Sequence, residues 1–173
     1  AMVQTSGVGR SAGRVVLLSL VAVVAYVLLA LRVETDLTDE DVAAIGVLGV
    51  GPACDGVIGD FESELSCLRA IQTSVLAIGD DTCGTWADRI EPASFIERGY
   101  GCCFDRSRFI EKAARHYGFE TRHLFMIVPK WGLSITNVLP LGQSSHAASE
   151  ILTSRGWLGV DSVHPFILVD GAG

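Results

Sequence analysis

The chain has 173 residues, 49% of them hydrophobic, and a formal net charge of −7. This length is enough for one domain with a core of its own. All 20 acidic residues lie at or after Glu34, so residues 33–173 carry 10 basic and 20 acidic side chains, a net charge of −10. This balance excludes binding to nucleic acid through a basic surface, and an anionic lipid surface would repel it.

An apolar run precedes the acidic part of the chain. The 17 residues from Val15 to Leu31 carry no charge and are almost all apolar, and a membrane-spanning helix needs about 17–25 such residues. We therefore predict a short tail at 1–14 and a transmembrane anchor at 15–32. A cleavable signal peptide is the alternative, but no small-x-small cleavage site follows the run. A buried core helix is disfavoured because the run has no polar face.

The basic residues that flank this run predict its orientation. Arg10 and Arg14 precede it, whereas Arg32 follows it and leads into acidic residues. The positive-inside rule then places the N-terminus in the cytoplasm. The chain is thus predicted to be a single-pass membrane protein, anchored through residues 15–31, with an extracytoplasmic (periplasmic or extracellular) domain at 33–173.

The five cysteines of the chain show no CxxC or Cys/His spacing of the kind that binds zinc, so we expect no metal and no cofactor. In an exported domain, five cysteines indicate two disulfides and one free thiol. Four cysteines allow three pairings, between which the sequence does not choose. The five are Cys54, Cys67, Cys83, Cys102 and Cys103.

Residues 36–98 are predicted to form the helical part of the domain. Thr38, three residues before Asp41, begins one helix, and Asp60 is a suitable N-cap for the next. In that second helix the spacing of the apolar residues predicts a face turned to the core, and Cys67 beside it suggests a link to the loop that bears Cys54. Residues 80–101 contain Pro92 and several glycines and are expected to be irregular. The apolar face consists of Phe61, Leu65, Leu68, Ile71 and Val75.

Residues 99–173 are predicted to form a helix followed by a sheet. The helix runs from about 104 to 117 and ends at Gly118, a residue typical of helix C-termini. Its apolar stripe is opposed by a stripe of charged residues. Alternating segments at 121–129, 145–153, 156–163 and 164–171 are typical of strands separated by turns, so the fold class is α+β with an antiparallel sheet. The apolar stripe is Phe109, Ile110, Ala113, Ala114 and Tyr117, and the charged one is Arg106, Arg108, Glu111 and Lys112.

Cys103 stands at the predicted start of this helix, where unpaired N–H groups and the helix dipole favour a thiolate. A nucleophilic thiol also needs a histidine to move protons and a third group to orient that histidine. His146 is the best candidate, because a hairpin with its turn at 155–156 places Asp161 beside it. The other histidines are less suitable: His116 lies within the helix, His123 is expected to be structural, and His164 is the second choice as base.

Four ordered elements carry a resemblance to a known family. They are Gly101-Cys102-Cys103-Phe104-Asp105, then Gly118 to Arg122, then His146-Ala147 with Glu150, then Gly156-Trp157 with Asp161. In order and spacing they resemble the transglutaminase-like superfamily of papain-related thiol enzymes over residues 99–163. The chain differs from it two residues after the histidine, where the family often has tryptophan and this sequence has Ala148.

The resemblance implies a transglutaminase-like core in which Cys103 is the nucleophile, His146 the general base and acid, and Asp161 the orienting carboxylate. It also implies that Asp105 supports the helix start, with the Cys103 N–H and a second donor, for which Trp86 is the candidate, in the oxyanion hole. We expect Cys102 to be bridged to Cys83, and Trp157 to be a core residue.

The implied enzyme is a cysteine hydrolase or acyltransferase. It would act on an amide or ester of a peptide, protein or glycoconjugate in the cell envelope, through a Cys thioester that water or an amine resolves. The alternative is a non-catalytic binding or assembly subunit of a membrane-protein complex in the envelope.

Overall fold

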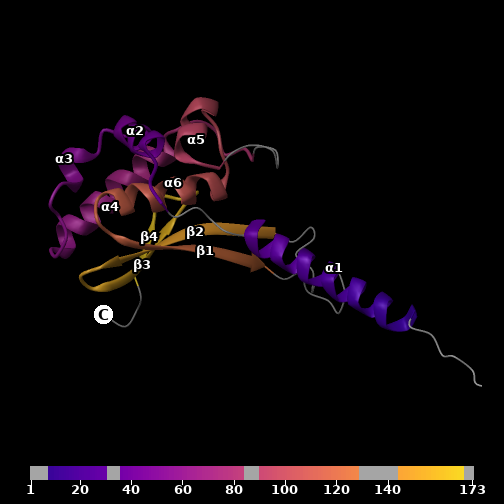
Figure 1. Cartoon of the computed structure of the whole chain (residues 1–173). Coiled ribbons are helices and arrows are strands. Elements are labelled where there is room, and N and C mark those ends of the chain that lie inside the picture. Colours follow the sequence, from indigo (N-terminus) through magenta and orange to yellow (C-terminus); the bar gives the residue numbers. More distant parts are fainter. Residues whose placement is uncertain (1–7, 31–35, 84–89, 129–143, 170–173) are drawn as a thin grey trace, which may run out of the picture. The chain divides into compact units, whose positions relative to one another are not determined.

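The computed structural model describes residues 8–30, 36–83, 90–128 and 144–169 (Figure 1). The chain divides into two units, Ala1–Asp36 and Leu37–Gly173. The division lies close to the boundary expected at residue 33. All residues of the candidate site belong to the second unit.

The first unit contains helix α1, Val8–Ala30. Within the described residues, no helix combines the length and the apolar character that crossing a bilayer requires. The prediction of a single-pass membrane protein with an extracytoplasmic domain is therefore wrong.

In the described part of the second unit, five helices precede the sheet. The two predicted N-caps are confirmed: the Thr38 hydroxyl accepts the Asp41 N–H at 3.1 Å, and the Asp60 carboxylate accepts the Ser63 N–H at 3.1 Å. The segment expected to be irregular holds a helix, because Pro92 is in its first turn, where its fixed φ and missing N–H favour a helix start. The helices are α2 Asp39–Val47, α3 Gly51–Cys54, α4 Phe61–Leu76, α5 Pro92–Arg98 and α6 Cys103–His116.

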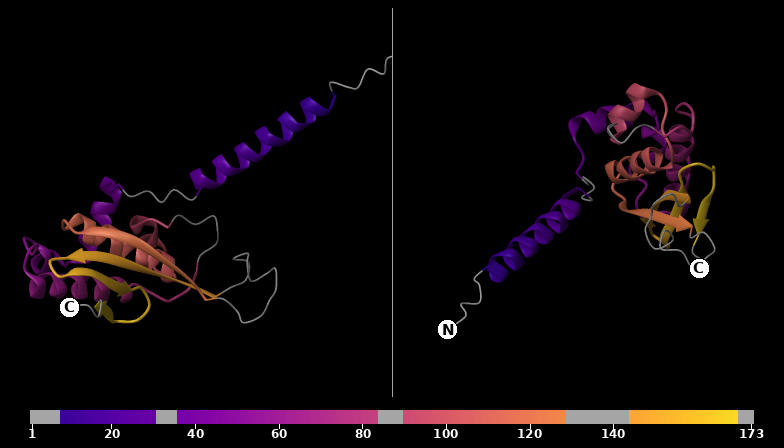
Figure 2. Two further views of the ribbon diagram at one scale, coloured as in Figure 1. Left: turned by 90° about the horizontal axis from the view of Figure 1, so that it is seen from below. Right: turned by 90° about the vertical axis from the view of Figure 1, so that its right-hand side faces the viewer.

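Among the described residues, four antiparallel strands follow and form one sheet in the order β1-β2-β3-β4. The helices of this unit lie on one side of the sheet, with α6 directly against β1 and β2 (Figures 1 and 2). The prediction of an α+β domain with an antiparallel sheet is confirmed. The strands are β1 Glu120–Val128, β2 Ser144–Thr153, β3 Gly156–Asp161 and β4 Ile167–Val169.

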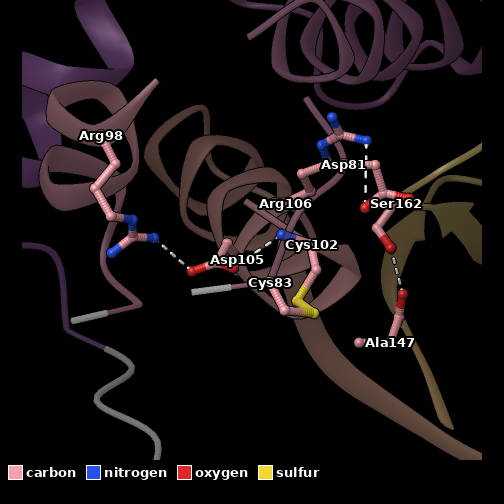
Figure 3. Close-up of a disulfide and its surroundings, with 8 residues drawn as sticks. All are labelled: Asp81, Cys83, Arg98, Cys102, Asp105, Arg106, Ala147 and Ser162. Atoms are coloured by element: carbon pink, nitrogen blue, oxygen red, sulfur yellow. Dashed lines mark hydrogen bonds and ion pairs between the residues drawn. A yellow bond between two sulfur atoms is a disulfide. The ribbon is translucent and has the colours of Figure 1, made fainter. Parts of the chain in front are cut away.

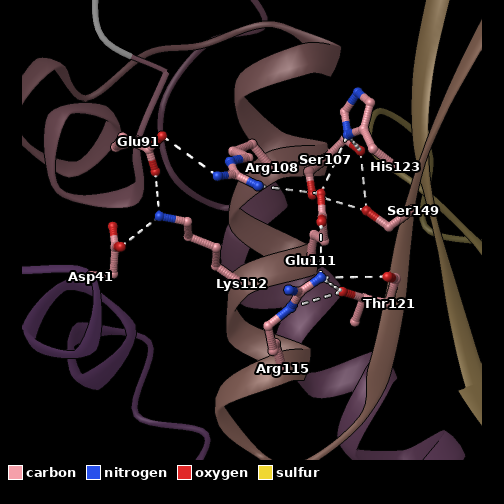
Figure 4. A network of polar contacts seen from close by, with 10 residues as sticks. All are labelled: Asp41, Glu91, Ser107, Arg108, Glu111, Lys112, Arg115, Thr121, His123 and Ser149. Atoms are coloured by element: carbon pink, nitrogen blue, oxygen red, sulfur yellow. Dashed lines mark hydrogen bonds and ion pairs between the residues drawn. The ribbon is translucent and has the colours of Figure 1, made fainter. Parts of the chain in front are cut away.

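Helix α6 is buried on all sides over most of its length. Its predicted apolar stripe packs in the core, where Phe109, Ile110, Ala113 and Ala114 are fully buried. The charged stripe was predicted on the opposite side of the helix. It is buried as well, because α2 and α5 pack over it. The covered charges are neutralised in pairs: Lys112 binds Asp41 and Glu91, and Arg108 lies 3.6 Å from Glu91 (Figure 4).

The cysteines pair as the sequence suggested. One disulfide joins Cys54 to Cys67 and so fastens α3 to α4, and a second joins Cys83 to Cys102. Cys103 is the free thiol.

Candidate active site

The first turn of α6 holds Cys103 in a defined position. Cys102 is the N-cap residue, and its N–H donates to Asp105 Oδ2 at 3.0 Å, which closes the turn around the carboxylate. The other oxygen of Asp105 accepts a hydrogen bond from Arg98 Nη2 of α5 at 2.7 Å (Figure 3). Asp105 thus has the supporting position that the sequence suggested, between the end of α5 and the start of α6.

A second set of contacts fixes the loop that crosses this helix start. The Cys83–Cys102 disulfide ties the loop to the N-cap (Figure 3). Arg106 of α6 also donates to the carbonyl of Gly79 at 3.0 Å. Gly101 allows the chain just before α6 to lie close to α5, since a Cβ at residue 101 would be 2.7 Å from the Phe95 ring. The start of α6 is therefore held from two directions.

Cys103 itself is the first residue of α6 and is partly exposed. The N–H groups of the first helical turn have no acceptor within the helix, so they can donate to an anion that forms there. A half-open thiol at this position is accessible to a reagent or substrate, unlike a buried structural cysteine.

The β2–β3 hairpin joins His146 and Asp161, as predicted. Asp161 is the register partner of Ala148, which lies two residues from His146 on the same face of β2. His146 Nε2 lies 2.7 Å from Asp161 Oδ2. The other oxygen, Asp161 Oδ1, accepts the N–H of Val163 at 2.8 Å and the N–H of His164 at 2.7 Å.

These contacts keep Asp161 ionised. Burial by itself would raise the pKa of Asp161, but the N–H groups of His164 and Val163 and the hydrogen bond from His146 lower its pKa overall. A carboxylate can only accept, so the hydrogen of the short contact is on Nε2 of His146. When the ring is neutral, Nδ1 is then a proton acceptor, which is the form that a general base requires.

The packing of α6 on β2 places Cys103 and His146 at the same end of the two elements. Ser107 Oγ lies 3.1 Å from Ser149 Oγ, and Arg115 binds Thr121, the register partner of Ile151, so α6 and β2 run in the same direction. Cys103 precedes Ser107 by four residues, and His146 precedes Ser149 by three.

The strand alternation separates the two groups by face. Ser149 and Ala147 are fully buried toward α6, whereas His146 belongs to the other set of β2 side chains, with Ala148. Among the described residues, no hydrogen bond joins the Cys103 thiol to the His146 ring. The structure thus brings His146 and Asp161 together, and it places Cys103 at the same end of the sheet as this pair.

No protein-family model, characterised protein or solved structure matches this chain. The resemblance to transglutaminase-like enzymes therefore rests on the four sequence elements alone.

The remaining candidates have other surroundings. His123 Nδ1 lies 3.4 Å from Glu111 Oε2 and 3.5 Å from Ser107 Oγ, which makes it a structural residue between α6 and the sheet. His164 is exposed and its ring stacks on Phe166. Trp86 lies outside the described residues.

Two further expectations concern Trp157 and metal binding. Trp157 is partly exposed, with the Arg122 guanidinium 3.7 Å above its ring, so it is not a fully enclosed core residue. The described part of the chain contains no group of His, Cys, Asp and Glu side chains that could hold a metal ion.

One residue near the site had no role in the sequence interpretation. Gln72 of α4 is buried, and its carboxamide binds the segment that follows β3. Its sequence signal is weak, a single amide beside the predicted apolar stripe of a helix. The carbonyls that it binds lie about 90 residues away in the sequence.

Proposed function

We propose that this protein is a thiol hydrolase or acyltransferase of the transglutaminase-like type. The observation that carries the proposal is the His146–Asp161 pair at 2.7 Å, at the same end of the α6–β2 interface as the free thiol of Cys103. The pair has the order of roles that thiol catalysis needs, namely a carboxylate that orients an imidazole whose other nitrogen accepts a proton.

The proposed reaction requires the Cys103 thiol and the His146 ring to come within hydrogen-bonding distance when the substrate binds, after which the thiol proton passes to His146 Nδ1. The thiolate then forms a bond to the carbonyl carbon of an amide or ester, and the carbonyl π electrons move to oxygen, where the Cys103 N–H can donate to the oxyanion. Collapse of the intermediate breaks the C–N or C–O bond, and the imidazolium gives its proton to the departing amine or alcohol.

The second half of the reaction releases the acyl group. His146 takes a proton from water or from an amine, which attacks the thioester carbonyl, and the thiolate leaves and is reprotonated by the imidazolium. Water gives a carboxylic acid and an amine gives a new amide. The substrate class is an amide or ester of a peptide, protein or glycoconjugate.

Alkylation by iodoacetamide tests the first step. We expect Cys103 at about pH 7 to react at least about tenfold faster than the thiol of an unstructured peptide, with the adduct located by mass spectrometry. His146→Ala should remove this enhancement, whereas His164→Ala, which removes a nearby exposed imidazole, should retain it. A Cys103 that reacts like a peptide thiol, with no effect of His146→Ala, would refute the proposal.

A binding module is the second candidate function, favoured by the lack of a thiol–imidazole hydrogen bond among the described residues. In such a module, the pair and the helix start would have structural roles alone. It predicts a folded protein with ordinary Cys103 reactivity, so the alkylation experiment distinguishes the two functions.

A further inference from the structure

We propose that Gln72 is a positioning residue for the His146–Asp161 pair, because its carboxamide holds the turn that orients the Asp161 carboxylate. The inference rests on the proposed function for its catalytic meaning. Its geometric basis is independent of that function and concerns one buried side chain and one turn.

The side chain of Gln72 donates to three backbone carbonyls at once. Its Nε2 lies 2.8 Å from the oxygen of Asp161, 3.1 Å from that of His164 and 2.9 Å from that of Phe166. Gln72 is 2% exposed. Because all three partners are acceptors, the atom that faces them must be the amide nitrogen, and its two hydrogens are shared among three oxygens.

The backbone N–H groups of the same turn bind the carboxylate of Asp161. Within residues 161–166, the N–H groups of Val163 and His164 point to Asp161 Oδ1, and the Phe166 N–H donates to the His164 carbonyl at 2.8 Å. The N–H groups thus converge on the carboxylate while carbonyls converge on Gln72. With Oδ1 held in this way, Oδ2 is directed to His146 Nε2.

The convergence of carbonyls explains why a donor is needed. Three carbonyl oxygens near one point repel one another, and the Asp161 carbonyl, whose contact with Gln72 is buried, would lose that donor at a cost. Without the carboxamide, the turn is expected to open so that the carbonyls reach water. Opening would also withdraw the two N–H groups from Asp161 Oδ1, and the carboxylate would no longer be held against the imidazole.

Gln72→Met tests this role, since methionine keeps the length of the side chain and removes its donors. We expect the Asp161 pKa, followed by ¹³C NMR of its carboxyl carbon, to rise toward the ordinary value as the two N–H groups withdraw. We also expect the ¹⁵N signals of the His146 ring to lose the pattern of the Nε2-protonated tautomer. Alkylation of Cys103 should slow by about three- to tenfold.

Ile71→Val is the matched control. It trims the neighbouring residue of α4, which is buried in the hydrophobic core and makes no polar contact through its side chain, so it should reduce stability and leave both NMR signatures unchanged. A Gln72→Met protein that shows the same pattern as this control, a lower stability with unchanged NMR signals, would overturn the inference.

A measurement on the unaltered protein covers the case in which Gln72→Met does not fold. The carboxamide hydrogens of Gln72 should exchange slowly with water and show nuclear Overhauser contacts to residues of the turn. Rapid exchange without such contacts would overturn the inference.

The failure of this inference differs from the failure of the proposed function. If Gln72→Met disturbs Asp161 and His146 while the unaltered Cys103 reacts like a peptide thiol, Gln72 positions the pair and the protein is not a thiol enzyme. If Cys103 is activated and Gln72→Met leaves the NMR signals and the alkylation rate unchanged, the enzyme stands and Gln72 has no positioning role.

Discussion

Lys112→Met removes a buried ammonium group from between two carboxylates. Lys112 Nζ lies 2.6 Å from Asp41 Oδ2 and 2.5 Å from Glu91 Oε2, and so connects the middle of α6 to α2 and to the residue that precedes α5 (Figure 4). Methionine fills a similar volume without the charge. The substitution therefore isolates the electrostatic role of Lys112 from its packing.

The expected loss of stability is large because the pair is out of water. Lys112 is 1% exposed and Asp41 is 1% exposed, so solvent screens their interaction little. Removing one partner of a buried ion pair leaves the other charge without compensation and costs about 3–5 kcal/mol. The free energy of unfolding of a domain is about 5–15 kcal/mol, so this loss is between about a fifth and all of the stability and should lower the unfolding midpoint clearly.

The pH dependence of this loss of stability follows from the pKa of Asp41. Burial by itself would raise the pKa of Asp41, but the hydrogen bonds from Lys112 and Thr38 lower its pKa below the ordinary value. A carboxyl group with a lowered folded pKa stabilises the protein above its unfolded pKa, about 3.9, and that stabilisation is lost as the pH falls through the folded pKa. The difference between Lys112→Met and the unaltered protein should thus be largest near pH 7 and shrink below about pH 4.

Urea unfolding followed by circular dichroism at several pH values measures this difference. Arg69→Met is the matched control, since it removes an exposed cation from α4 and should change the free energy of unfolding by less than about 0.5 kcal/mol. A loss below about 1 kcal/mol for Lys112→Met, or a loss that does not depend on pH, would show that the ion pair does not stabilise the fold as argued.

Three further variants test other parts of the site and its support. Gly101→Ala places a Cβ 2.7 Å from the Phe95 ring and should lower the unfolding free energy by about 1–3 kcal/mol, a loss that thermal unfolding would detect. Cys54→Ser with Cys67→Ser opens a cross-link between residues 13 apart and should cost about 3 kcal/mol in urea; an unchanged midpoint would contradict this. Asp161→Asn should slow iodoacetamide alkylation at least about tenfold, since an amide can hold the imidazole in the wrong tautomer; an unchanged rate would count against the roles assigned to the pair.

The parts of the fold that the sequence predicted depend on short-range rules. Thr38 and Asp60 were identified as N-caps because a side-chain oxygen can reach an N–H three residues on, whatever the rest of the chain does. The pairing of His146 with Asp161 is similar, since a tight turn fixes the register of the hairpin. The turn was predicted at 155–156 and lies at Ser154–Arg155. Each of these needs knowledge of about 20 residues or fewer.

The parts that it missed depend on contacts between distant segments. A charged stripe on a helix normally indicates a solvated face, and nothing near α6 in the sequence reveals that Asp41 and Glu91 will cover it. Gln72 was missed for the same reason, since its partners begin at Asp161. A polar residue's role is visible in the sequence when its partner is close along the chain and hidden when the partner comes from another element.

These long-range contacts explain how Cys103 and His146 acquire fixed positions. The position of the thiol is set by α6. This helix is bound to α5 by the ion pair of Asp105 with Arg98, and to α2 by the ion pair of Lys112 with Asp41. The imidazole is placed by the hairpin and, in our proposal, by Gln72 on α4. The helix that bears the thiol and the strand that bears the imidazole are in contact at Ser107 and Ser149. The distance between thiol and imidazole is therefore set by how α6 is positioned along β2. A change at this interface would alter that distance without touching either reactive group.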